Sequence, residues 1–175
     1  MHENDVNDAW NAHSDRTILE GSEVLFMPRA RIPSHFYVFV VVEHAGQVLL
    51  VREAKHGQRW YAPAGGLEAG ETIREAAIRE TQEEAGILVE PTSLLRVEQQ
   101  WFTSESGEGL VSWWRYVVRA HPVGSLTPKH RPDHHSLEAR WVRPEAIGQL
   151  PLRHPEVIDL VALALTNPAS MPLVA

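Results

Sequence analysis

The spacing of apolar residues along the chain predicts a mixed α/β fold. Runs rich in branched and aromatic residues alternate with polar, glycine-containing segments, a pattern typical of strands joined by turns. The strand candidates lie at 36–43, 47–53, 94–102, 111–120 and 138–142. His44-Ala45-Gly46 is typical of a hairpin turn between the first two, and 103–109 is a polar connection between the next two. Apolar residues at helical spacing over 155–165 predict a closing helix.

A short helix is predicted from Ile73 to Ala85. Thr72 and Glu75 have the spacing of a capping box, and Gly86 suits the left-handed conformation that ends many helices. One face of this helix begins with apolar residues and becomes acidic after about two turns. The acidic part of that face consists of Glu80, Glu83 and Glu84.

These three carboxylates lie at the i, i+3 and i+4 positions of the helix, where like charges repel by roughly a few tenths of a kcal/mol per pair. Helix stability therefore gives no reason to gather them. One interpretation is a solvated acidic face, because exposed charge is common on protein surfaces. The alternative is a site for a hard divalent cation such as Mg²⁺, which prefers carboxylate oxygens and often joins a protein carboxylate to a substrate phosphate.

The residues around the helix favour the cation site. Gly65 is followed after five residues by Glu71, and after seven more by Arg79 and the sequence ETQEEAGI. This pattern resembles the Nudix (MutT-like) box, the signature of hydrolases that cleave nucleoside diphosphates linked to another group. Every polar and glycine position of the box is filled, and Thr81 stands where the family usually has an aliphatic residue. The resemblance implies a Nudix-type α/β/α sandwich with a mixed β-sheet.

The resemblance also implies roles for residues in and beside the box. Glu80, Glu83 and Glu84 match the family's metal-binding carboxylates, with Mg²⁺ as the expected ion and Mn²⁺ as a substitute. In this family a backbone carbonyl of the glycine turn also reaches the metal, which here points to Ala64. Glu80 is the first candidate for the general base, although the family's base varies and can lie on a loop outside the box.

Arg79 and Glu71 match family residues that support the metal ligands. An arginine can hold a carboxylate in a bidentate pair and so fix the side-chain conformations of the ligands. A local salt bridge between loop and helix is the simpler interpretation, and the two are compatible. Gly65 and Gly66 permit a close approach of the backbone that a β-carbon would hinder.

Residues outside the box are candidates for substrate binding, because aromatic rings can stack on a base and arginines can contact phosphates. These candidates are Arg52, Arg59, Trp60, Tyr61, Phe102 and Asp133. Asp133 lies in the loop 127–135, where some family members supply a further carboxylate, although an ordinary solvated loop is the simpler interpretation. Alternatives for that role are His134, His135, Glu98 and Glu105. The tryptophans expected to pack in the core are Trp113, Trp114 and Trp141.

The expected function is Mg²⁺-dependent hydrolysis of a phosphoanhydride bond in a nucleoside di- or triphosphate or another nucleoside diphosphate derivative. The stretch WYAPAGGLEAGE is similar to members that remove phosphate from 8-oxo-guanine nucleoside diphosphates, so oxidised nucleotides are one substrate class. Hydrolysis of ADP-ribose or nucleotide sugars is an alternative, but Phe102 stands where ADP-ribose enzymes tend to carry a proline. The other alternative is a non-catalytic sensor of nucleotides or ADP-ribose, whose carboxylates are often eroded.

Composition narrows the remaining choices. With 175 residues and 43% hydrophobic content, the chain suits one domain, expected at 18–166, with flexible ends at 1–17 and 167–175. There is no cysteine, which excludes disulfides and thiolate chemistry, including that of the Nudix-fold isoprenoid isomerases. The net charge of −7 argues against a nucleic-acid-binding surface.

The expected partner is a small nucleotide or diphosphate. The longest apolar run, 37–42, is too short to cross a bilayer, and the acidic N-terminus does not have the pattern of a secretory signal. A cytoplasmic protein without membrane partners is therefore expected. Nudix domains are frequently dimers, so a homodimer is one expected assembly.

Overall fold

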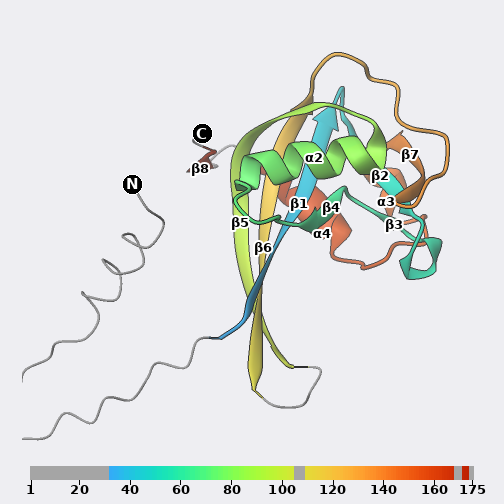
Figure 1. The fold of residues 1–175 in the computed structure, drawn as a ribbon. Coiled ribbons are helices and arrows are strands. Elements are labelled where there is room, and N and C mark those ends of the chain that lie inside the picture. The colour runs from blue at the N-terminus through green and yellow to red at the C-terminus, as the bar shows by residue number, and fades with distance from the viewer. Residues whose placement is uncertain (1–31, 105–108, 168–170, 174–175) are drawn as a thin grey trace, which may run out of the picture. The chain divides into compact units, whose positions relative to one another are not determined.

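The computed structural model describes residues 32–104, 109–167 and 171–173 (Figure 1). The strands in these ranges are β1 (Ser34–His44), β2 (Gln47–Glu53), β3 (Trp60–Tyr61), β4 (Ala64–Gly66), β5 (Val89–Thr103), β6 (Leu110–Pro122), β7 (Ser136–Val142) and β8 (Met171–Pro172). The helices are the 3₁₀ turn η1 (His56–Gln58), α2 (Ile73–Ala85), α3 (Pro144–Ile147) and α4 (Val157–Thr166). The segment 1–17, the start of the expected domain at 18–31, and Glu105 lie outside the described residues.

The strands form one mixed sheet with the order β3-β2-β1-β6-β5-β8, in which β7 pairs with β2 and β4 pairs with β1. β1 and β6 run parallel from the Ser34–Ser112 pair to the Val42–Ala120 pair. The other strand pairs are antiparallel. The predicted mixed sheet is confirmed.

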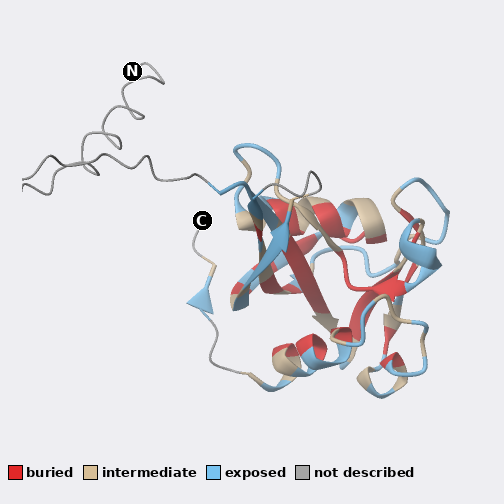
Figure 2. Ribbon diagram, turned by 90° about the horizontal axis from the view of Figure 1, so that it is seen from below, coloured by how far each residue is buried: buried red, intermediate tan, exposed pale blue. Residues whose placement is uncertain are grey.

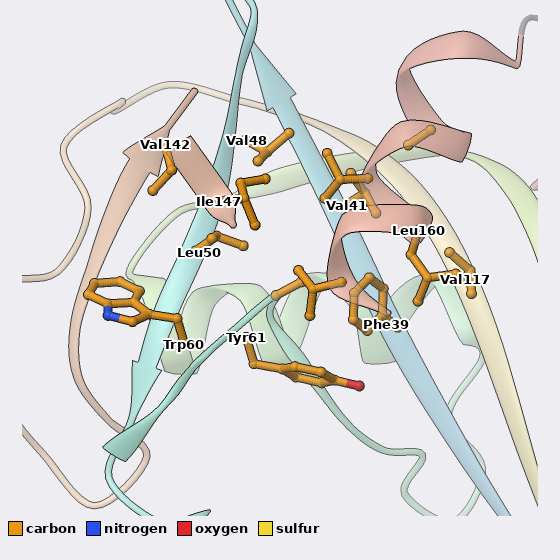
Figure 3. Close-up of a cluster of buried hydrophobic side chains, with 14 residues drawn as sticks. Phe39, Val41, Val48, Leu50, Trp60, Tyr61, Val117, Val142, Ile147 and Leu160 are labelled. Atoms are coloured by element: carbon orange, nitrogen blue, oxygen red, sulfur yellow. The ribbon is translucent and has the colours of Figure 1, made fainter. Parts of the chain in front are cut away.

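Helices cover both faces of the sheet, because alternate residues of its central strands point to opposite sides. Phe39 and Val41 of β1 pack with α3 and α4 in the cluster drawn in Figure 3. Val38 and Val40 pack on the other face, against α2. Figure 2 shows buried segments, in red, on the central strands and on the helices. The predicted α/β/α sandwich is confirmed, and no helix of the described residues has the length and apolar character needed to cross a membrane.

The helix α2 has the predicted bounds and the predicted caps. Thr72 Oγ1 accepts a hydrogen bond from the Glu75 N–H at 3.2 Å, and Glu75 Oε2 accepts one from the Thr72 N–H at 2.8 Å. Gly86 ends the helix with a φ of 69°, in the left-handed region that favours glycine. Local sequence alone therefore determined where this helix begins and ends.

The strand β5 begins at Val89, earlier than the predicted residue 94. Its pairing with β6 is irregular between Pro91 and Ser93 and again between Leu94 and Arg96. Such irregularities allow a proline within a strand and interrupt the alternation on which the prediction depended. The strand β8 lies within the tail expected to be flexible, and it pairs with β5 at Ser93 and Leu94.

The strand β1 has two partners along one of its edges, since β6 occupies the other edge. Its first half pairs with β4, where Phe39 lies opposite Ala64, and its last residues pair with β2, where Glu43 lies opposite Val48. The sheet therefore divides between β4 and β2. This division places the glycine turn of β4 against α2.

Candidate functional site

The glycine turn and α2 pack directly on each other. Gly65 lies in β4, and a β-carbon at this position would overlap the carboxylate of Glu80 on α2. Only glycine therefore allows the turn to lie on that carboxylate. Glu80 is 8% exposed. Burial raises the pKa of its carboxyl group, and the hydrogen bond from Arg79 opposes this effect.

Arg79 connects the loop before α2 with the acidic face of the helix. Its Nε and Nη2 atoms donate to the two oxygens of Glu71 at 2.8 and 2.9 Å, and Nη2 also donates to the carbonyl of Gly66 at 2.8 Å. Nη1 donates to Glu80 Oε1 at 2.7 Å and lies 3.4 Å from Glu83 Oε2. The Arg79 hydrogen bonds hold the pKa of Glu71 below its usual value. The predicted bidentate pair is present, and the same guanidinium fixes two further carboxylates.

Glu84 lies one helical turn beyond Glu80 and is half-buried. Its Oε2 atom accepts a hydrogen bond from the Ala64 N–H at 3.1 Å. Burial raises the pKa of Glu84 to about 8; the Ala64 hydrogen bond opposes this shift, and the charges of Glu80 and Glu53 add to it. The carboxylates at the glycine turn thus carry more negative charge than their own hydrogen bonds offset.

The groups at the turn suit a hard divalent cation by their chemistry. Within the described part of the chain, no three carboxylate or imidazole groups already converge into a metal site, and Arg79 engages both Glu80 and Glu83. The donors near Gly65 are nevertheless oxygens, which such a cation prefers. In addition, Glu53 Oε2 is buried without a hydrogen-bond partner. A cation would offset the burial and the neighbouring negative charges that raise the pKa of Glu84.

A cleft of about 640 Å³ opens beside Glu84 and the glycine turn. This volume is typical of small-ligand sites. Three aromatic rings gather in its wall: the centroids of Tyr37 and Trp113 are 4.8 Å apart, and those of Phe102 and Trp113 are 5.3 Å apart. The cationic residues that line the cleft are Lys55, Arg115 and Arg153. Carboxylates, cations and aromatic faces therefore share one cavity.

The structure brings four of the predicted site residues to this cleft, namely Tyr61, Ala64, Glu84 and Phe102. Trp60 does not reach it, contrary to the prediction. Its side chain is 3% exposed and packs in the core, where Figure 3 places it between β2 and β7. The guanidinium carbon of Arg140 on β7 lies 4.0 Å from its ring centroid.

Seven other predicted residues are also absent from the cleft lining, namely Glu71, Arg79, Glu80 and Glu83 in or just before α2, and Arg52, Arg59 and Asp133. Arg52 Nη1 is 3.4 Å from Glu138 Oε1 on the neighbouring strand, and Arg59 is exposed. Asp133 accepts hydrogen bonds from Lys129 Nζ at 2.7 Å and from the backbone N–H of Ser136 at 3.1 Å. These bonds hold the pKa of Asp133 well below its usual value. They also engage its carboxylate in hydrogen bonds with its own loop and the first residue of β7. Of the alternatives named for its role, the residues that line the cleft are His134, His135 and Glu98.

Several residues that line the cleft were not predicted from the sequence. Trp113 was expected in the core, but it is 43% exposed and lines the cleft, whereas Trp114 and Trp141 are half-buried. The reason is that β1, β5 and β6 run on beyond the helices that cover the sheet (Figure 1). Glu53 could have been noticed as a charged residue at a buried position of the apolar strand QVLLVRE. Arg115, which pairs with Glu98 and Glu156, gave no local signal.

Comparison with known proteins places this geometry in a family. The family model described as the NUDIX domain matches residues 32–162. The chain is 40% identical over 143 residues to the Mus musculus protein named 8-oxo-dGDP phosphatase NUDT18, and the alignment covers 79% of this chain and 41% of that protein. It is 36% identical over 129 residues to phosphatase NudJ of Escherichia coli, covering 73% of this chain and 80% of NudJ. The chain thus spans less than half the length of the mouse relative.

Solved structures show the same architecture. A NUDIX hydrolase from Nitrosomonas europaea superposes with a TM-score of 0.64 at 27% sequence identity. The match covers 80% of this chain and 93% of that one. The similarity therefore extends over most of the chain.

Proposed function

Because the chain belongs to the NUDIX family, we propose that it is a hydrolase that cleaves a phosphoanhydride bond in a nucleoside di- or triphosphate or another nucleoside diphosphate derivative. The observation that carries this proposal is the single cleft that joins Glu84 and the glycine turn to the aromatic group of Tyr37, Phe102 and Trp113. One end of the cleft suits a metal-bound diphosphate, and the aromatic end suits a base.

Hydrolases of this family generally need a divalent metal ion. We assign Mg²⁺ to this chain, with Mn²⁺ as a substitute, and we assign its oxygen ligands to Glu80, Glu83, Glu84 and the carbonyl of Ala64. The oxygen chemistry of these groups, and the burial and neighbouring carboxylates that raise the pKa of Glu84, support the assignment. When bound, the ion supplies positive charge that neutralises phosphate oxygens.

The residues of the chain supply positioning and proton transfer. Arg79 holds Oε1 of Glu80, which leaves Oε2 to accept a proton from the attacking water. As the water oxygen bonds to phosphorus, the anhydride P–O bond breaks and the phosphate group leaves with its electron pair. Glu71 keeps the Arg79 guanidinium in place through its bidentate pair, so it acts through Arg79 rather than on the substrate.

Substrate selection is assigned to the aromatic part of the cleft. The exposed ring of Trp113, supported by Tyr37 and Phe102, offers a face on which a base can stack. Because the mouse relative is named as an 8-oxo-dGDP phosphatase, we propose oxidised guanine nucleoside diphosphates as the first substrates to assay.

The test is a hydrolysis panel of nucleotides, oxidised nucleotides, nucleotide sugars and ADP-ribose, with Mg²⁺ or Mn²⁺ added. We expect metal-dependent release of phosphate or of a nucleoside monophosphate, and ¹⁸O-water identifies the attacked phosphorus. Glu84→Gln should abolish this activity, whereas Glu90→Gln, on the exposed start of β5, should not. Wild-type rates in Glu84→Gln would refute the assignment, and tight binding without turnover across the panel would favour a nucleotide sensor.

A further inference from the structure

Glu53 occupies an unusual position for a carboxylate. It is the last residue of β2, whose preceding residues Val48–Val51 are fully buried, and it is itself only 7% exposed. The pairing of β2 with β7 is irregular between Arg52 and Glu53, which turns this final residue out of the regular ladder. Burial of an acid at the end of a strand destabilises the folded chain, because it removes the charge from water.

Only one of the two carboxylate oxygens of Glu53 has a protein partner. Arg153 Nη1 lies 2.7 Å from Oε1, and the side chain is 9% exposed in this pair. Oε2 is buried and accepts no hydrogen bond, and the one other such side-chain atom among the described residues is Arg119 Nε. Buried carboxylate oxygens are normally satisfied, so Oε2 requires a partner other than the ones that the fold supplies.

The position of Glu53 indicates what that partner is. Glu53 lines the same cleft as Ala64, Gly65 and Glu84, and it approaches from the sheet rather than from α2. We propose that Glu53 Oε2 is a further oxygen ligand for the divalent cation that the α2 carboxylates bind. The inference rests on the proposed function, and it extends the cation site from one helix to the end of β2.

Arg153 is then a positioning residue. Its guanidinium holds Oε1 and lies over the ring of Tyr61, 5.1 Å from the centroid, so both its orientation and that of Glu53 are fixed. A purely structural ion pair is the competing interpretation. It accounts for Oε1 but leaves Oε2 unexplained, because a guanidinium can engage both oxygens of a carboxylate, as Arg79 does with Glu71.

The test measures binding of Mn²⁺ alone to the full chain, from the EPR signal of the free ion. The variants are Glu53→Gln, Glu53→Asp, Glu84→Gln and the control Glu138→Gln. Glu53→Gln removes the charge and keeps the shape, whereas Glu53→Asp keeps the charge and withdraws the oxygens by one methylene. Glu138, on the exposed side of the adjacent strand β7, is matched in charge and paired with Arg52.

We expect Glu53→Gln and Glu53→Asp to weaken Mn²⁺ binding at the affected site by about 10- to 100-fold, the loss typical when a group that supports a metal is removed. Glu138→Gln should bind as wild type. If Glu53→Gln binds Mn²⁺ as wild type does, Glu53 is not a ligand and serves only as the ion-pair partner of Arg153. If only Glu53→Asp binds Mn²⁺ as wild type does, Glu53 affects the ion through its charge at long range and not by direct ligation. If Glu53→Gln does not fold, Glu53→Asp decides.

The failure of this inference can be told from the failure of the proposed function. If Glu84→Gln weakens Mn²⁺ binding and both Glu53 variants do not, the metal site on α2 stands and the extension to β2 is wrong. If Glu84→Gln binds Mn²⁺ as tightly as wild type, the metal assignment itself fails.

Discussion

Replacing Glu84 by glutamine should remove activity and yet stabilise the metal-free protein at neutral and mildly alkaline pH. In the folded chain, burial raises the pKa of Glu84 to about 8, whereas an unfolded glutamate titrates at about 4.3. The folded state therefore binds more protons than the unfolded state between these values. The free energy of unfolding that this group contributes is fully present below about pH 4 and is lost as the pH rises toward 8.

The size of the effect follows from proton linkage. One proton of difference between the two states changes the free energy of unfolding by about 1.4 kcal/mol per pH unit at most. Because Glu84 is half-buried, we expect a smaller change, about 1–2 kcal/mol between about pH 5 and pH 7. Glutamine cannot ionise, so it lacks this dependence and still offers an oxygen to the Ala64 N–H.

The assay is urea unfolding in EDTA at several pH values, followed by tryptophan fluorescence. The difference in free energy of unfolding between Glu84→Gln and wild type reports Glu84 together with its coupling to Glu80 and Glu53, because titrating residues that do not interact with Glu84 affect both proteins alike. That difference should shift in favour of the variant as the pH rises, whereas Glu90→Gln should run parallel to wild type. Parallel curves for Glu84→Gln would refute the reasoning, since they would mean that the Glu84 carboxylate is already compensated in the metal-free chain.

Three further substitutions test the geometry. Gly65→Ala should lower kcat/KM by about 100-fold or more, because its methyl group overlaps a carboxylate on α2 and displaces it, whereas Gly66→Ala makes ordinary contacts and should remain active. Arg79→Lys should lower kcat by about 10- to 100-fold, since an ammonium cannot reproduce the bidentate pair; an unchanged kcat would reduce that pair to a local salt bridge. Trp113→Ala should raise the KM for a nucleotide by about 10-fold, and Trp101→Ala, half exposed and outside the cleft, should not.

Features that depend on neighbouring residues were predictable from the sequence. The bounds of α2 follow from the capping box at Thr72 and the left-handed Gly86, and the close contact at Gly65 follows from the spacing of the box. The pairing of Arg79 with Glu71 belongs to the same class, because both residues lie within one turn and helix. The residues that make each of these interactions lie close together in the chain, so the local sequence pattern includes both partners.

The cleft belongs to the other class of feature. Whether Trp113 is buried depends on where β1, β5 and β6 extend beyond the helices, and a pattern of alternation does not indicate that limit. The irregular start of β5 was also beyond local prediction, since it arises from pairing with the distant strand β6.

The sequence by itself determined the family and the helix that carries the acids, and it predicted the class of reaction, because these features depend on residues a few positions apart. The tertiary structure decided which side chains share a cavity. Glu53 shares the cleft with Glu84 and pairs with Arg153, which lies 100 residues away in the chain, and its unpartnered oxygen is visible only in the folded structure. Burial and contacts between distant residues are properties of the packed chain, so only the three-dimensional structure shows them.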